Sequence, residues 1–138
     1  MREILFRGKR YDIGEWIEGG IYHNSEDEIV FIIKDTGLGY HEFIEVIPET
    51  VGQFTGLYDN GTKIFEGDIL AQNWYDIDEP ADDSFGEVVF SGADCSFSVL
   101  DLNKSEIMPI GRGCAYHYEV EVIGNIHDNP ELLKGVKE

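Results

Sequence analysis

The side chains best suited to chemistry are the carboxylates between positions 76 and 83, because hard cations prefer carboxylate oxygens as ligands. The acidic residues of this segment are Asp76, Asp78, Glu79, Asp82 and Asp83. Asp76 and Asp78 begin the alternate spacing of an EF-hand calcium loop, but Pro80 stands at the third ligand position and Ala81 at the glycine position. The spacing therefore predicts no metal site here.

The cysteines and histidines also lack the context that catalysis or metal binding requires. Cys114 and His117 have a spacing found in zinc sites, but tetrahedral zinc needs four ligands and no second pair follows. The other histidines, His23, His41 and His127, occur singly. Cys95 is predicted to be a small buried apolar residue and Cys114 a loop thiol, and neither has an activating neighbour. The sequence thus predicts no enzyme and no catalytic, cofactor-binding or metal-binding residue.

Charge and composition exclude further classes of function. The 138 residues include 28 Asp and Glu against 10 Lys and Arg, a net charge of -18, whereas nucleic-acid binders need clustered basic residues. No apolar run approaches the ~20 residues of a membrane helix. Arg7 ends the first apolar stretch after three residues, too early for an export signal, so we expect a cytoplasmic protein. Free thiols are then expected, although the distance between Cys95 and Cys114 stays open.

A two-residue alternation of polar and apolar side chains runs through the chain and predicts β-strands. Residues 95–99 and 117–122 alternate without a break, and the apolar run at 29–33 is typical of a strand covered on both faces. Further short strands are predicted at 4–6, 15–17, 43–47, 64–71 and 87–90. Only 48–51 and 129–134 favour helix, for no more than two turns. The fold class is therefore mainly β.

Two turns and one acidic segment organise the middle of the chain. Asp59-Asn60-Gly61 between two apolar arms predicts a hairpin, since both Asn and Gly tolerate a left-handed backbone. Gly67 can turn the chain again, after which Asp68 can hydrogen-bond nearby backbone and a strand restarts. Residues 73–85 are rich in Asp and Glu and contain Pro80, so we expect an exposed acidic loop there. Residues 1–138 are expected to form one domain.

Three blocks of the sequence resemble the YopX family of small phage and prophage proteins. They are MREILFRGKR (1–10) with GEWIEG (14–19), VIPETVGQFTGLYDNG (46–61) with IFEGDI (64–69), and VIGNIHDNPELL (122–133). The resemblance implies a β-rich fold with a small SH3-like barrel, placed near residues 46–72, and a role in the cytoplasm of a bacterial host. It implies no activity and no cofactor. Its recurring Gly52, Gly56, Gly67 and Asp68 are interpreted as turn residues.

Two classes of function remain open, and a third alternative is an enzyme of unknown activity. The first is a non-enzymatic phage accessory protein that works through protein–protein contacts, as a homo-oligomer paired through exposed strand edges or with a bacterial host protein. The second is an acidic decoy that occupies the nucleic-acid site of a host protein through Asp76, Asp78, Asp82 and Asp83. Direct binding to nucleic acid or to a membrane is not expected.

Overall fold

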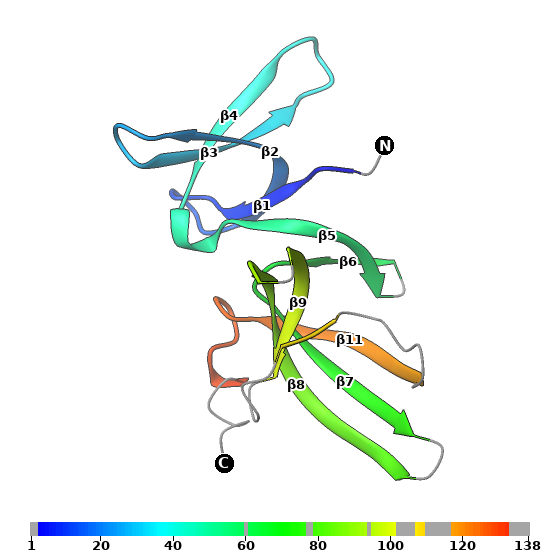
Figure 1. Ribbon diagram of the computed structural model, residues 1–138. Coiled ribbons are helices and arrows are strands. Elements are labelled where there is room, and N and C mark those ends of the chain that lie inside the picture. The colour runs from blue at the N-terminus through cyan, green and yellow to red at the C-terminus, as the bar shows by residue number, and fades with distance from the viewer. Residues whose placement is uncertain are drawn as a thin grey trace. The chain divides into compact units, whose positions relative to one another are not determined.

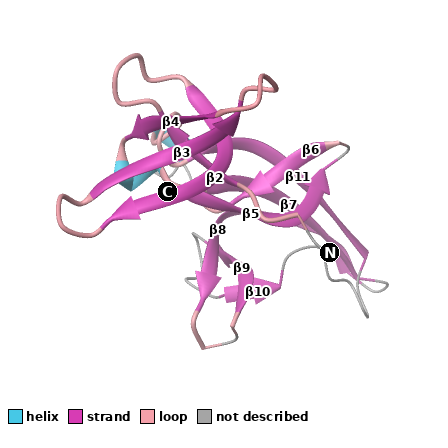
Figure 2. Cartoon of the chain, turned by 90° about the horizontal axis from the view of Figure 1, so that it is seen from above, coloured by secondary structure: helices cyan, strands magenta, loops and turns pink. Residues whose placement is uncertain are grey.

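The computed structural model describes residues 3–59, 61–76, 79–93, 95–101, 107–109 and 117–132 (Figure 1). Only the backbone is described at 72–76, 79–84, 101, 107–109 and 117–120. Antiparallel strands dominate these residues, as Figure 2 shows, and confirm the mainly-β prediction. The chain divides into two compact units, Met1–Leu57 and Tyr58–Glu138, and each is described separately. The expectation of a single domain over residues 1–138 stays a prediction.

The first unit is built from β1 (Phe6–Lys9), β2 (Trp16–Asn24), β3 (Ile29–Asp35), β4 (His41–Val46) and β5 (Gly52–Asp59), the last of which runs into the second unit. Their order in the sheet is β4-β3-β2-β1-β5. A short 3-10 helix, η1 (Pro48–Thr50), links β4 to β5 and confirms the single turn predicted at 48–51. Four of the strands predicted from alternation, at 4–6, 15–17, 29–33 and 43–47, overlap β1 to β4.

β2 pairs with two different neighbours along its length, and two glycines mark the change. Its first half pairs with β1, ending at Gly19 opposite Phe6, and its second half pairs with β3, starting at Gly20 opposite Ile33. A Cβ placed on Gly19 would lie 2.2 Å from the carbonyl oxygen of Ile33, so the two strands approach too closely there for any side chain. Glycine in a strand interior often marks such a bend or close backbone approach.

The core of the first unit lies on one face of this bent sheet. Its buried members are Val30, Ile32 and Val46, packed against Phe6, Ile17, Ile21 and Val51. An isolated bridge joins Arg10 to Val46, so the outer side of β4 meets the end of β1. Gly8 makes room for this approach, because a Cβ there would lie 3.0 Å from the Val46 side chain.

The second unit contains the other sheet, with its own core. The strands of this unit are β6 (Thr62–Phe65), β7 (Asp68–Asp76), β8 (Glu79–Ser91), β9 (Ser96–Asp101), β10 (Ile107–Pro109) and β11 (His117–Asn125). All of them except β6 form the sheet, in the order β10-β9-β8-β7-β11. Its buried residues Ile64, Leu70, Val88 and Val99 pack together with Phe97 and Val122. The predicted strands at 64–71, 87–90, 95–99 and 117–122 all overlap elements of this unit.

One prediction about the middle of the chain needs correction, and another stays a prediction. Residues 73–85 are not a loop: they belong to β7 and β8, which pair from Ile69 opposite Glu87 to Asp76 opposite Glu79, with residues 77 and 78 outside the described part. Pairing satisfies the backbone of this segment, which its acidic composition did not reveal. Near residues 46–72 the described strands form no closed barrel, and the SH3-like detail stays a prediction.

The predicted turn residues agree with the structure only in part. Gly61 and Gly67 lie in turns and each have a φ of 88°, a left-handed conformation that favours glycine. Gly56 has the same φ but lies inside β5, so it is not a turn residue. The buried carboxylate of Asp68 accepts the backbone N–H of Phe65 at 2.8 Å, closing the turn before β7. Gly52 also lies inside β5, opposite Arg7, rather than in a turn. At the end of the described chain, Glu131 and Leu132 form helix, within the predicted helical segment 129–134.

Candidate binding surface

The first unit exposes a cluster of three aromatic rings on the outer face of its sheet. Tyr22 on β2 and Phe31 on β3 are directly opposite each other, and Phe43 on β4 joins them. The three ring centroids are 6.3 to 6.4 Å apart, and Phe43 meets both other rings edge to face. Tyr22 is 49% exposed and Phe43 58% exposed. We call these three residues the aromatic face.

The opposite side of the same strands explains why these rings face outward. Side chains alternate along a strand, so Val30 and Ile32 enter the core while Phe31 between them cannot. The run at 29–33 is therefore buried on one face only, which corrects the prediction of a strand covered on both faces. Exposed apolar clusters of this kind often mark interaction sites in soluble proteins.

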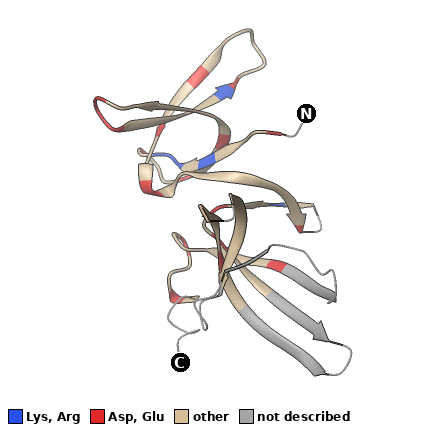
Figure 3. Ribbon diagram, in the orientation of Figure 1, with Lys and Arg blue, Asp and Glu red and all other residues tan. Residues whose placement is uncertain are grey.

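β1, a strand of the same sheet, carries the basic residues Arg7 and Lys9, and its ribbon is partly blue in Figure 3. The guanidinium carbon of Arg7 lies 4.7 Å from the centroid of the Trp16 ring, and the Lys9 ammonium lies 5.5 Å from it. Both distances are within the range of cation–π attraction, which holds the cations over the ring. Two cationic side chains thus lie over the Trp16 ring, which is not part of the aromatic face.

A pocket of about 200 Å³ opens at the outer side of β4. It is lined by Tyr11 and Asp12, which follow β1, and by Ile44 and Glu45 of β4. The Tyr11 N–H donates to the Glu45 carbonyl oxygen at 3.0 Å and fixes the two walls relative to each other. The pocket therefore combines an aromatic ring, an aliphatic side chain and carboxylates within one small space.

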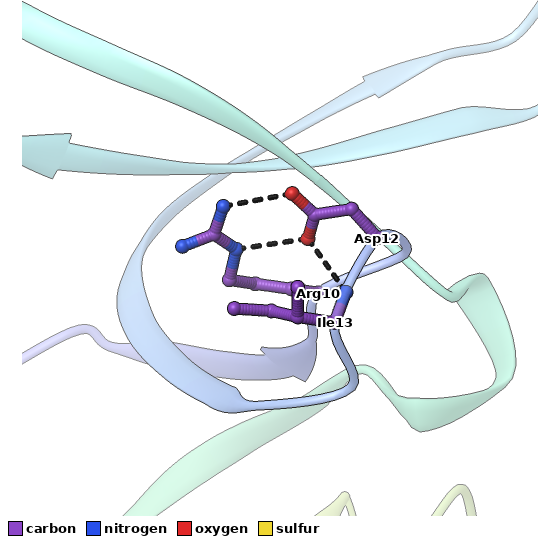
Figure 4. A network of polar contacts seen from close by, with 3 residues as sticks. All are labelled: Arg10, Asp12 and Ile13. Carbon is purple, nitrogen blue, oxygen red and sulfur yellow. Dashed lines mark hydrogen bonds and ion pairs between the residues drawn. The ribbon is translucent and has the colours of Figure 1, made fainter.

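An ion pair shapes one wall of this pocket (Figure 4). Arg10 donates to both carboxylate oxygens of Asp12, at 3.0 Å from Nε and 2.8 Å from the terminal nitrogen, and the Ile13 N–H donates to the same carboxylate at 2.8 Å. The hydrogen bond from Arg10 lowers the pKa of Asp12, and the same bond raises the pKa of Arg10. The Asp12 carboxylate is therefore already bound by Arg10 and by the Ile13 N–H. Among the described residues no interaction of the Glu45 carboxylate is found.

The residues singled out from the sequence do not converge on a site. Cys95 is not buried: it is an exposed free thiol with a φ of 53°, its Sγ lying 3.6 Å from the Gly92 carbonyl oxygen. That segment turns before β9 begins, so the predicted alternation starts one residue later. His23 and His41 are exposed on β2 and β4, and His127 lies in the turn after β11. Cys114 lies outside the described residues.

The acidic cluster and the pair Cys114 and His117, for which no metal site was predicted, have their side chains outside the described residues. Those of Asp76, Asp82, Asp83 and His117 lie outside the described part, as does Asp78 altogether. Within the part of the chain that is described, no group of three His, Cys, Asp or Glu side chains could hold a metal ion. In the same part no helix is long and apolar enough to span a membrane.

Sequence reasoning missed both the aromatic face and the pocket. The alternation of β2 and of β4 could have indicated that Tyr22 and Phe43 share one face with polar neighbours. Their meeting with Phe31 depends on the register between three strands, which alternation alone does not give. The pocket depends on the bridge between Arg10 and Val46, and no local pattern signals so distant a pairing.

The two antiparallel sheets define a mainly-β protein with almost no helix in its described residues. Compared with known families, residues 5–134 match the model of the YopX protein family. This match covers nearly the whole chain, so the chain belongs to the YopX family, as the three sequence blocks predicted. A comparison with curated proteins finds no match.

Proposed function

We propose that this YopX-family protein is a non-enzymatic accessory protein of a phage or prophage that acts in the bacterial cytoplasm through protein–protein contacts. The observation that carries the proposal is the aromatic face, which holds exposed ring surface where a solvated sheet would present polar side chains. The resemblance of its sequence blocks to phage and prophage proteins supports the proposed origin. No cofactor is needed for a function of this kind.

The first partner we propose for the aromatic face is a second copy of the chain. A two-fold interface sets one patch against the same patch, so ring would pack on ring with no further requirement for complementarity. Fully buried aromatic side chains contribute about 150–250 Å² each, and these rings are already partly covered. Three rings alone therefore supply less than the ~1,200 Å² of a standard interface, which predicts weak, concentration-dependent pairing.

Sedimentation velocity over a range of protein concentrations tests this proposal. Because each protomer has a net charge of -18, salt screens the repulsion between copies, and we expect pairing to strengthen between about 50 mM and 500 mM salt. Phe43→Ser removes one ring from each side of the interface and should raise the dimer dissociation constant by about tenfold. Phe90→Ser is the matched control, because Phe90 is 53% exposed in the second unit.

Two outcomes would contradict the proposal. One is a monomer at every concentration and salt, and the other is pairing that Phe43→Ser and Phe90→Ser weaken equally. The decoy hypothesis depends on Asp76, Asp78, Asp82 and Asp83, whose side chains lie outside the described part, and it stays a prediction.

A further inference from the structure

β4 is the outermost strand of the first sheet, and only its last residues have a partner on their outer side. The Tyr11 N–H donates to the Glu45 carbonyl oxygen at 3.0 Å, and the Ile47 N–H donates to the Lys9 carbonyl oxygen at 2.8 Å. Backbone groups alternate in direction along a strand, so those of Phe43 point to the same side as those of Glu45. Beyond the bridge, no described residue of the first unit pairs with this side.

The open part of β4 therefore begins where the chain's own pairing stops. After Tyr11 the chain turns away through residues 11–13, leaving His41, Glu42 and Phe43 exposed. An extended segment could continue the line of residues 9–11 along this edge and take up the free N–H and C=O of Phe43. Its side chain opposite Ile44 would lie on the same face as Ile44, beside the pocket.

The charges around the pocket favour a segment with positively charged side chains. Arg10 lies in the field of Asp12, Glu15 and Glu42, all of which raise its pKa, and Glu45 adds a further carboxylate to the pocket wall. Arg10 thus lies near three carboxylates and Glu45 in the pocket wall is a fourth, while Lys34 on β3 is opposite Glu42. The Tyr11 ring and Ile44 provide an apolar lining against which the methylene stem of a Lys or Arg can pack, with its charged end near Glu45.

We propose that the open edge of β4 and the adjoining pocket bind an extended, positively charged segment of a partner protein. The segment adds a strand beside His41–Ile44 and places one Lys or Arg side chain between Tyr11 and Glu45. The proposal deepens the proposed function, on which it rests only in assuming that the protein acts through protein contacts. It uses the backbone of Phe43 and the pocket, whereas pairing through the aromatic face uses the Phe43 ring.

A basic partner fits this edge better than a second copy of the chain. The whole protein carries -18 charges, so an approaching copy would on average bring more carboxylates to a site that already holds four. A cationic segment instead gains attraction during its approach and loses it as salt is added. The salt dependence of the two contacts is therefore opposite: pairing through the aromatic face strengthens with salt, and binding at the β4 edge weakens.

The probe is a short, end-blocked peptide of alternating valine and arginine, titrated into the purified full chain. Binding is followed by calorimetry and by amide chemical shifts, and a peptide with glutamate in place of arginine is the charge control. We expect the arginine peptide to bind, the glutamate peptide not to bind, and the largest shifts to fall at His41–Glu45. A peptide with N-methylated valines cannot pair as a strand and should bind at least tenfold more weakly.

Two pairs of variants separate this site from general attraction to an acidic protein. Glu45→Gln should weaken binding about two- to fivefold, as expected for a partly exposed ion pair, while Glu26→Gln in the turn before β3 should not. Phe43→Pro and Phe43→Ser both remove the ring, but only proline removes the outward N–H of the edge. Phe43→Pro should therefore weaken binding at least fivefold relative to Phe43→Ser. The urea midpoint of each variant verifies that it is folded.

Three results would overturn the proposal. Equal effects of Glu45→Gln and Glu26→Gln would show that the peptide responds to overall charge only. Equal affinity of Phe43→Pro and Phe43→Ser would show that no strand is added. Self-association that is lost in Phe43→Pro but kept in Phe43→Ser would identify a second copy as the occupant of the edge. None of these results depends on whether the aromatic face pairs, so the proposed function can fail separately.

Discussion

The closest backbone approach in the first unit predicts opposite effects for the same substitution at two adjacent glycines. In Gly19→Ala the new Cβ would lie 2.2 Å from the Ile33 carbonyl oxygen and 3.0 Å from the side chain of the fully buried Ile32. In Gly20→Ala the nearest atom would be Ile33 Cβ at 3.8 Å, an ordinary contact. The two variants change the unfolded chain almost identically, so their difference reports the folded state.

The magnitude follows from how far the strands must move. Relieving a 2.2 Å contact with backbone requires β2 and β3 to separate by about 1 Å, and overpacking of this kind costs about 1–3 kcal/mol. Gly20→Ala removes the entropic cost of a strand glycine and should stabilise the protein by up to about 1 kcal/mol. Gly19→Ala gains the same amount from its unfolded chain, so the free energies of unfolding of the two variants should differ by the overpacking cost, about 1–3 kcal/mol.

Urea unfolding followed by tryptophan fluorescence measures this difference. The chain has two tryptophans, Trp16 on β2 and Trp74 on β7, so a Trp74→Phe background makes the signal specific to the first unit. With an m-value of about 2 kcal/mol/M, we expect the midpoint of Gly19→Ala to lie about 1 M below that of Gly20→Ala. Coincident midpoints would refute the close approach of the two strands at Gly19.

Three further substitutions test separate features of the structure. Thr50→Val removes a buried hydroxyl that accepts the Lys9 N–H at 2.9 Å and donates to the Ile47 carbonyl oxygen at 2.6 Å, so urea unfolding should show a loss of about 1–3 kcal/mol. Burial raises the pKa of Glu87, so the folded state holds more protons than the unfolded state just above the ordinary pKa, and stability falls as pH rises through that window. Urea midpoints measured across that window should fall less in Glu87→Gln than in the parent protein. Cys95 has a φ of 53°, which glycine adopts without strain, so Cys95→Gly should raise the free energy of unfolding by no more than about 1 kcal/mol and raise the thermal midpoint with it. An unchanged or lower thermal midpoint would count against strain at this turn.

The sequence was sufficient to predict elements whose signal is local. The alternation at 117–122, the apolar run at 29–33 and the proline-led turn at 48–51 each overlap an element of the expected type. The family resemblance was confirmed as well, because it rests on blocks spread over nearly the whole chain. These features depend on residues close to one another in sequence.

The features that could not be predicted depend on pairing between distant segments. Residues 73–85 are acidic and contain Pro80, which favours a loop locally, yet β7 and β8 pair across this stretch. Whether a strand such as β3 is covered on both faces depends on what lies beyond its neighbours, so Phe31 was expected in the core and lies in the aromatic face. Cys95 was assigned to a strand that begins one residue later. Long-range pairing decided the first two cases, and a local turn with a left-handed Cys95 decided the third.

The division of β2 between two neighbours constrains how the length of this protein can vary. An inserted residue between Gly19 and Gly20 would turn Ile21 out of the core and Tyr22 into it, because one extra residue reverses every face downstream. Only a pair of added residues would restore the original orientation. The turn at 25–28 has no such restriction, since length added there leaves both strands in place. We therefore expect the turn at 25–28 to tolerate insertions of any length, including engineered tags. Between Gly19 and Gly20 we expect only insertions of an even number of residues to keep the faces of the strand.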